Sequence, residues 1–190
     1  MGKMKRITIC LLLILLGPVV IRAELTRKEM INPDGTVEHV FYSDGKEIAK
    51  QKVGDDGSII QTTGTIPDGV VRGYSKSGRL EYECNYRDNK LEGIARTYYE
   101  SGKLMREWNY KDNKLNGITK WYFENGNLMR QFNYKDGKLE GMSKKFYENG
   151  GIWSIKTYKN GKFINRKEYD KEGKLMSEWN YLIEKKENKR

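Results

Sequence analysis

The chain has 190 residues, of which 33% are charged and 37% hydrophobic, and its formal net charge is +10. This length fits one domain or an elongated repeat array with flanks, and the small hydrophobic share disfavours a deep globular core. Thirteen tyrosines favour a thin fold of half-buried strands, because Tyr can cover a sheet face while its hydroxyl reaches water. All three prolines precede residue 68, so the rest of the chain can form uninterrupted strand ladders.

Residues 1–23 have the order of a secretory signal peptide. Basic residues precede the apolar run Ile7–Leu16, and Ala23 offers a small residue for cleavage. The apolar stretch of about 15 residues is shorter than the roughly 20 that a membrane-spanning helix needs. We therefore expect a secreted or periplasmic, cell-envelope protein, with an uncleaved membrane anchor as the alternative.

Removal of this segment changes the charge and the cysteine count. Residues 1–23 carry four basic residues and no acid, so the net charge falls from +10 to +6. Cys84 is the one cysteine that remains, so the mature chain has no internal disulfide to form.

Residues 24–68 are predicted to form an irregular β-hairpin region with eroded repeats. Turn signals such as Asn32-Pro33-Asp34-Gly35 recur every 10–12 residues. Between them lie β-type runs at 37–42, 48–53 and 58–63, which indicate a hairpin meander. An atypical first copy is typical of a capped repeat array.

From residue 69 to 181 a repeat of about 24 residues governs the chain. The stretch from Gly93 to Gly117 recurs almost unchanged from Gly117 to Gly141, and the turn glycines are spaced by 24, 24, 24 and 23 residues. A second turn, Asp-Asn, Asp-Gly or Asn-Gly, divides each unit, and these residues supply the positive φ of tight hairpin turns. Each unit is therefore predicted to be one hairpin of two strands. The fold class is all-β, an elongated antiparallel repeat sheet.

Alternation along the strands predicts the faces of this sheet. In the second strand of the unit, Leu104, Trp108 and Tyr110 share one side. In the first strand, Ile94 and Tyr98 share a side and are expected to join them in one apolar, aromatic face. The copies degrade after residue 141, and residues 182–190 are predicted to be a charged tail.

The repeat resembles a known family. Paired glycines, the Tyr-Tyr-Glu triplet and the 24-residue register over residues 69–181 are similar to the bacterial variant of the MORN repeat, found in antitoxin-like proteins. The resemblance implies an extended antiparallel sheet with one hairpin per repeat, and interaction instead of catalysis. The signal-like N-terminus departs from the intracellular antitoxin pattern.

No catalytic, cofactor-binding or metal-binding residues are predicted. His39 is the single histidine and has no partner of the kind that a metal site needs. Cys84 stands where Trp108 and Phe132 stand in other copies, which indicates a small apolar face residue. The recurrent acids Glu100, Glu124 and Glu148 are interpreted as solvated turn charges, since a catalytic pair would break the repeat symmetry.

Specificity is expected where the copies differ, beside the aromatic positions that recur. The candidate interaction surface consists of Thr97, Tyr99, Trp121, Phe123, Lys145 and Tyr147. The aromatic series could stack a peptide or glycan, or it could simply hold the sheet together. Lysines near the turns could contact anionic lipid or cell-wall polymer, or protect the sheet edges.

These observations predict a non-catalytic secreted or envelope repeat protein that mediates protein–protein interaction. The alternatives are an antitoxin or immunity-like role, and association with a membrane or cell-wall surface. A protein partner is expected, nucleic acid is not, and no pattern indicates an oligomeric state.

Overall fold

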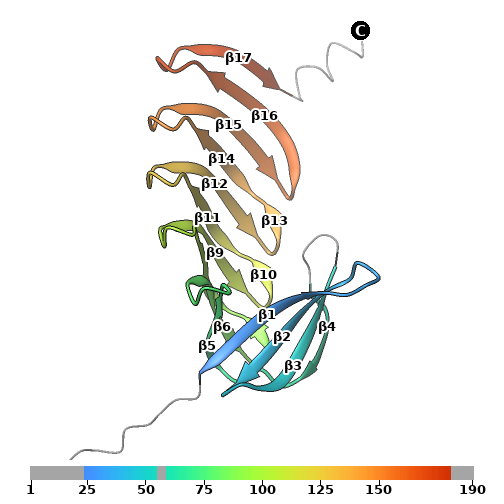
Figure 1. Ribbon diagram of the computed structural model, residues 1–190. Coiled ribbons are helices and arrows are strands. Elements are labelled where there is room, and N and C mark those ends of the chain that lie inside the picture. The colour runs from blue at the N-terminus through green and yellow to red at the C-terminus, as the bar shows by residue number, and fades with distance from the viewer. Residues whose placement is uncertain (1–23, 55–58, 181–190) are drawn as a thin grey trace, which may run out of the picture.

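A computed structural model describes residues 24–54 and 59–180, and the predictions for 1–23 and 182–190 lie outside them. The described residues form one large sheet, mostly antiparallel and built of hairpin repeats, so the predicted fold class is confirmed (Figure 1). The strands are β1 (Leu25–Ile31), β2 (Val37–Ser43), β3 (Lys46–Val53), β4 (Ile59–Gly64), β5 (Gly69–Tyr74), β6 (Leu80–Arg87), β7 (Lys90–Leu91), β8 (Gly93–Tyr98), β9 (Leu104–Lys111), β10 (Lys114–Leu115), β11 (Gly117–Tyr122), β12 (Leu128–Lys135), β13 (Lys138–Leu139), β14 (Gly141–Phe146), β15 (Ile152–Lys159), β16 (Lys162–Tyr169) and β17 (Leu175–Asn180).

The repeat strands pair in chain order. From β5 the pairings run through β6, β8, β9, β11, β12, β14, β15 and β16 to β17, all antiparallel. The two-residue strands β7, β10 and β13 extend the hairpin ends of β6, β9 and β12. In Figure 1 the hairpins stack into an elongated column that ends at β17.

The N-terminal strands form a meander that joins the column by its first strand. β1, β2, β3 and β4 pair in sequence, and β1 then pairs in parallel with β5. The strands predicted at 37–42, 48–53 and 58–63 are present within two residues. β1 was not predicted, because its charged centre (Arg27, Lys28, Glu29) hides the strand pattern; pairing with both β2 and β5 forms it.

Positive φ angles mark the turns that the sequence predicted. Asp112 and Asn113 have φ of 49° and 63°, the pair of left-handed residues that a two-residue hairpin turn of type I′ requires. Gly93 has a φ of 77° and begins β8, just after the short β7. The first strand is therefore interrupted in the units that contain β7, β10 and β13, which the sequence pattern did not reveal, whereas β16 is continuous.

The predicted faces are wrong for the first strand of the repeat. Register places Ala95 opposite Trp108, and Ile94 opposite Asn109. Directly opposed residues project to the same side of an antiparallel sheet, so Ile94 lies on the other face from Trp108. Accordingly, Ala95 is 9% exposed and Ile94 38%.

Leu104 and Tyr98 also lie away from Trp108. The register of β8 and β9 shifts between Thr97 and Tyr98, so that Tyr98 opposes Leu104. A β-bulge of this kind inverts the alternation beyond it. We call the face that carries Trp108 and Tyr110 the inner face, and the opposite one the outer face.

The hydrophobic core lies where the N-terminal strands cover the first part of the inner face. Phe41 of β2 is 1% exposed and meets the Tyr86 ring edge-on, with ring centroids 5.3 Å apart. Val71 and Cys84 are buried in the same cluster. Trp108 and Tyr110 are only partly buried at its margin, so the inner face is open over the later repeats.

Candidate interaction surface

One row of side chains crosses the open inner face from β8 to β15. Each member is the direct register partner of the next, which places all of them on one side of the sheet. We call this the inner row; it consists of Thr97, Arg106, Trp121, Arg130, Lys145 and Ser154.

The centre of the inner row is a tryptophan between two guanidinium groups. The Cζ atoms of Arg106 and Arg130 lie 4.6 Å and 5.2 Å from the Trp121 ring centroid. Planar guanidinium groups stack on aromatic faces and keep their N–H fork available to acceptors. The stack therefore holds two cations in fixed orientations on the inner face.

A small hollow of about 170 Å³ adjoins this stack at strands β12, β14 and β15. Its lining includes the cations Arg130, Lys145 and Lys156. It also includes Ser143 and Ser154, which are 6% and 7% exposed. The Oγ of Ser143 is buried without a hydrogen-bond partner. The hollow thus combines positive charge with a free hydroxyl.

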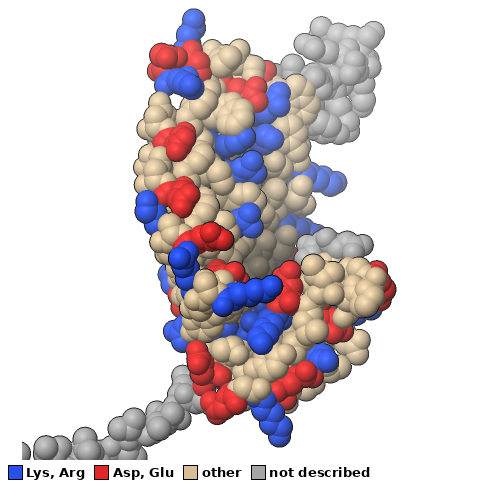
Figure 2. All heavy atoms as spheres, viewed as in Figure 1, with Lys and Arg blue, Asp and Glu red and all other residues tan. Residues whose placement is uncertain are grey.

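These cations repel one another, and the acid that lies on the same face, Glu168 of β16, forms its ion pair with Arg166 instead. Burial lowers the pKa of Lys145, and the positive charges of Arg130 and Lys156 lower it further. Within residues 24–54 and 59–180, no carboxylate forms an ion pair with Arg106, Arg130, Lys145 or Lys156. Figure 2 shows blue Lys and Arg atoms gathered along the hollowed middle of this view, with red acidic atoms at its margin.

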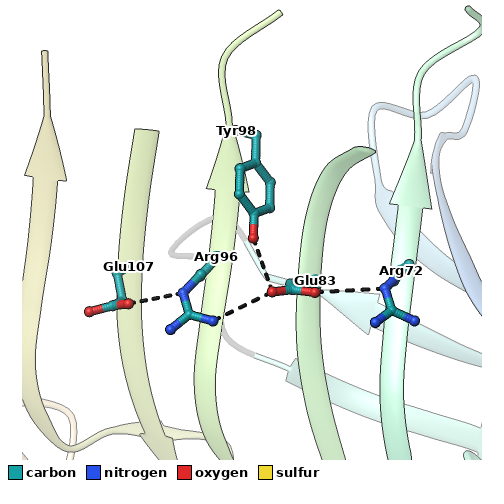
Figure 3. A network of polar contacts seen from close by, with 5 residues as sticks. All are labelled: Arg72, Glu83, Arg96, Tyr98 and Glu107. Atoms are coloured by element: carbon teal, nitrogen blue, oxygen red, sulfur yellow. Dashed lines mark hydrogen bonds and ion pairs between the residues drawn. The ribbon is translucent and has the colours of Figure 1, made fainter. Parts of the chain in front are cut away.

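On the outer face, by contrast, charged side chains form ion pairs with one another. Arg96 Nε lies 3.0 Å from Glu107 Oε2, and Arg96 Nη1 lies 3.5 Å from Glu83 Oε1. Arg72 approaches Glu83 from the other side at 3.7 Å, and the Tyr98 hydroxyl donates to Glu83 at 3.0 Å (Figure 3). Cross-strand ion pairs of this kind stabilise a sheet by about 0.2–1 kcal/mol each. The charges of this outer network are therefore neutralised internally, whereas Arg106, Arg130 and Lys145 of the inner row form no ion pair with any described residue.

Unpartnered polar atoms are also concentrated on the inner face. In the described part of the chain, seven buried side-chain polar atoms have no hydrogen-bond partner. Six belong to the inner face of the array, and the seventh is Arg27 Nε, whose guanidinium lies 3.9 Å over the Tyr82 ring. The six are Tyr82 Oη, Thr97 Oγ1, Thr119 Oγ1, Trp121 Nε1, Arg130 Nε and Ser143 Oγ.

A larger cleft of about 890 Å³ lies where β1 meets the array. Its lining mixes bases such as Arg27 and Lys76 with the acids Glu29 and Glu81. Because both signs of charge are present, this cleft has no clear preference for a ligand charge. The open inner row is the more distinctive surface.

The structure divides the six predicted surface residues into two groups. Thr97, Trp121 and Lys145 lie together in the inner row. Tyr99, Phe123 and Tyr147 stand at the turn edge instead, where the Tyr99 and Tyr147 hydroxyls donate to the backbone carbonyls of Tyr122 and Tyr169 at 2.6 Å and 2.8 Å. Each of these two tyrosines connects its own repeat to the next one.

Sequence reasoning left out the residues that complete the charge of the surface. Arg106, Arg130 and Lys156 are absent from the predicted surface. Lys156 stands where other copies have Trp108 and Phe132. The change from an aromatic residue to lysine at this position is the sequence signal that could have identified Lys156 as part of the surface.

The remaining candidates have structural roles. His39 Nδ1 lies 3.1 Å from Arg27 Nη1, and burial followed by the charge of Arg27 lowers the His39 pKa to about 3. Cys84 is a buried free thiol, as predicted for a face residue, and burial raises its pKa to about 12. No cluster of metal-ligating side chains occurs within the described ranges.

Comparison with known proteins identifies the repeat. A family model described as the MORN repeat variant matches residues 67–88, 91–112, 115–136, 139–160 and 165–182, more than half of the chain. No curated protein matches it. Repeats of this family generally mediate interactions with proteins or membranes and are generally not catalytic. No helix in the described residues is long and apolar enough to cross a membrane. The chain belongs to the MORN repeat variant family.

Proposed function

We propose that this chain is a non-catalytic repeat protein of the cell envelope or the extracellular space, and that it binds another protein through the inner face. The observation that carries this proposal is the inner row, in which cations without acidic partners alternate with an aromatic ring and unpartnered polar atoms. A partner that supplies acceptors and negative charge would neutralise these groups.

The composition of the inner row favours a docked protein partner. Arginine and aromatic residues are enriched in protein–protein interfaces, and an arginine–tryptophan stack is a rigid anchor of the kind that carries most binding energy.

The experiment compares two neighbouring aromatic residues of β11. Trp121→Ala removes the inner-face ring, and Tyr122→Ala removes a ring from the outer side of the same strand. Both variants and the unmodified chain would be used as bait in envelope extracts, after circular dichroism has shown that they are folded. We expect a stoichiometric protein that is lost with Trp121→Ala and kept with Tyr122→Ala. Recovery of no such protein, or equal recovery by both variants, contradicts the proposal.

The proposed location rests on residues 1–23. Their basic start, apolar run and small residue at 23 support export and cleavage. N-terminal sequencing of the native protein should begin at Glu24. A chain that still begins at Met1 in the membrane fraction would support the anchor instead.

The immunity-like role remains a prediction from family resemblance. It requires that the partner be a toxin, so the gene should become dispensable when that toxin is deleted. Dispensability with the toxin intact would contradict it.

A further inference from the structure

We propose that the hollow at strands β12, β14 and β15 binds a single phosphate monoester group, carried either by a soluble molecule or by a lipid headgroup. Such a site goes beyond the proposed function, because it takes a small anion and needs no protein partner. Its basis is the set of cations and buried polar atoms that line the hollow.

Two pairs of directly opposed cations lie on neighbouring strands at the hollow. Register places Arg130 opposite Lys145, and Lys156 opposite Arg166. Like charges in directly opposed positions destabilise an antiparallel sheet. Arg166 has an acid beside it, whereas the other three cations line the hollow and form no ion pair with a residue of the described ranges. A bound anion would remove the repulsion among these three charges.

The acid beside Arg166 is Glu168, which lies opposite Ser154 on the same face as the hollow. Both of its oxygens are engaged away from the hollow. Arg166 Nη1 lies 3.5 Å from Glu168 Oε1, and Ser177 Oγ donates to Glu168 Oε2 at 3.0 Å. Glu168 therefore belongs to a contact between β16 and β17 and leaves the cations of the hollow uncompensated.

Two buried polar atoms at the hollow also have no hydrogen-bond partner among the described residues. Ser143 stands opposite Lys156 and is 6% exposed, and its Oγ is one of these atoms. The Nε of Arg130 is the other. Buried polar groups of folded proteins are nearly always hydrogen-bonded, and an acceptor in the hollow would give both atoms a partner.

Aromatic rings hold two of the three cations in place. Arg130 Cζ lies 5.2 Å from the Trp121 ring centroid, and Lys145 Nζ lies 3.3 Å from the Trp153 ring centroid. A cation held over an aromatic ring keeps N–H groups available to acceptors. Because these charges are positioned before a ligand arrives, less side-chain ordering opposes binding.

Charge and size select a phosphate monoester over a carboxylate. Near pH 7 the phosphate group carries a charge of about −1.5 to −2 and presents three acceptor oxygens. A carboxylate has a single charge and two oxygens, and would leave most of the positive charge uncompensated. The volume of about 170 Å³ fits one small group.

The hollow occurs where the residues of the repeat change. Lys156 stands where Trp108 and Phe132 stand in the two preceding copies, and Ser143 stands where Ala95 and Thr119 stand. The preceding copies therefore present a different set of side chains at the equivalent place. We expect one phosphate group per chain.

The first test is isothermal titration calorimetry of the full chain near physiological salt, with phenyl phosphate and benzoate as matched ligands. We expect one phenyl phosphate per chain, bound at least tenfold more tightly than benzoate, because the dianion makes more charge-assisted hydrogen bonds. Equal affinities, or no binding of phenyl phosphate at millimolar concentration, overturn the proposal.

Four single variants locate the site. Ser143→Ala and Lys156→Gln each remove one group of the hollow, whereas Thr157→Val changes the other side of β15 and Lys159→Gln its end. The first two should each weaken phenyl phosphate binding at least fivefold, and the last two less than twofold. Since Ser143 Oγ has no partner among the described residues and Lys156 opposes Arg166, neither hollow variant should lower the melting temperature. Equal losses in all four, or a lower melting temperature of both hollow variants, overturn the assignment.

Vesicles separate the two sources of the group. Phosphatidic acid presents a phosphate monoester, whereas phosphatidylglycerol presents a diester. Binding to phosphatidic acid vesicles that is lost with Lys156→Gln supports the site and assigns the group to a lipid. Phenyl phosphate binding without vesicle binding supports the site and assigns the group to a soluble molecule. Equal binding to both kinds of vesicle that persists in Lys156→Gln is a response to membrane charge alone and overturns the proposal. The bait experiment with Trp121→Ala bears on the proposed function only.

Discussion

The tyrosines at one position of the repeat have different roles, and the role of each depends on what covers its ring. Tyr86, Tyr110, Tyr134 and Tyr158 occupy equivalent sites on the second strand of successive copies. At the first of them the N-terminal strands cover the ring, and its hydroxyl donates to Gln51 Oε1 at 2.9 Å. Gln51 is fully buried, so this hydrogen bond has no solvent substitute.

Tyr86→Phe should therefore destabilise the fold more than the same change elsewhere. It leaves Gln51 Oε1 buried without a donor, and we expect the free energy of unfolding to fall by about 1–3 kcal/mol. Tyr134→Phe, in a half-buried site with no such bond, should cost below about 0.5 kcal/mol. Urea unfolding of both variants checks this, and similar losses would show that the hydrogen bond contributes little.

His39 should make stability depend on pH. Its pKa of about 3 in the fold lies below the unfolded value of 6.5, because of burial and then the Arg27 charge. Glu29 Oε2 lies 3.7 Å from His39 Nε2, and the Glu29 side chain is largely exposed. The unfolded chain then binds the extra proton, so stability is retained above pH 6.5 and falls as the pH drops below it. The slope is at most about 1.4 kcal/mol per pH unit. Between pH 7 and 5, His39→Gln should flatten the unfolding free energy measured in urea; an unchanged slope contradicts the assignment.

At the scale of the element, the two-residue turns reverse the chain and also connect one copy of the repeat to the copy before it. The Leu91 backbone N–H donates to the Asn113 side-chain oxygen at 2.7 Å, and the Asn113 N–H donates back to the Leu91 carbonyl at 3.1 Å. Each turn thus bonds to the preceding copy. In the next two copies a glycine, Gly137 or Gly161, keeps only the backbone half of this pair.

Substitution at Asn113 should separate the two contributions. Asn113→Gly retains the left-handed conformation and loses the side-chain bond, at a cost of about 0.5–1.5 kcal/mol. Asn113→Ala loses the bond and strains the backbone, which should cost roughly 1–2 kcal/mol more. Guanidinium unfolding gives both values. If Ala and Gly cost the same, the φ of 63° is not a source of strain.

At the scale of the whole molecule, the array is anchored at one end. The N-terminal strands bury Phe41, Val71 and Cys84 to 3% exposure or less, whereas Leu175 and Met176 of β17 are 45% and 68% exposed. In a repeat array each unit contacts mainly its neighbours, so local stability follows local burial.

Hydrogen exchange should therefore form a gradient along the column. We expect amides of β2, β3, β5 and β6 to exchange slowest, and those of β17 at least tenfold faster. Exchange followed by mass spectrometry of peptic fragments measures this gradient. Uniform protection from β5 to β17 would show that the array unfolds as one cooperative unit.

The sequence by itself determined the period, the turns and the all-β class. These depend on local rules: Asn and Gly tolerate positive φ, and apolar residues alternate along a strand. Cys84 could be placed in the core because its position is aromatic in the next two copies, and burial confirms this.

Only the tertiary structure decided which face each strand presents. Alternation holds within an unbroken strand, but the positive φ of Gly93 and the bulge beside Tyr98 reset it twice in that copy of the repeat. Neither signal is visible as a change of composition. The inner row likewise required cross-strand register, since Arg106, Trp121 and Arg130 become neighbours only when successive hairpins pair.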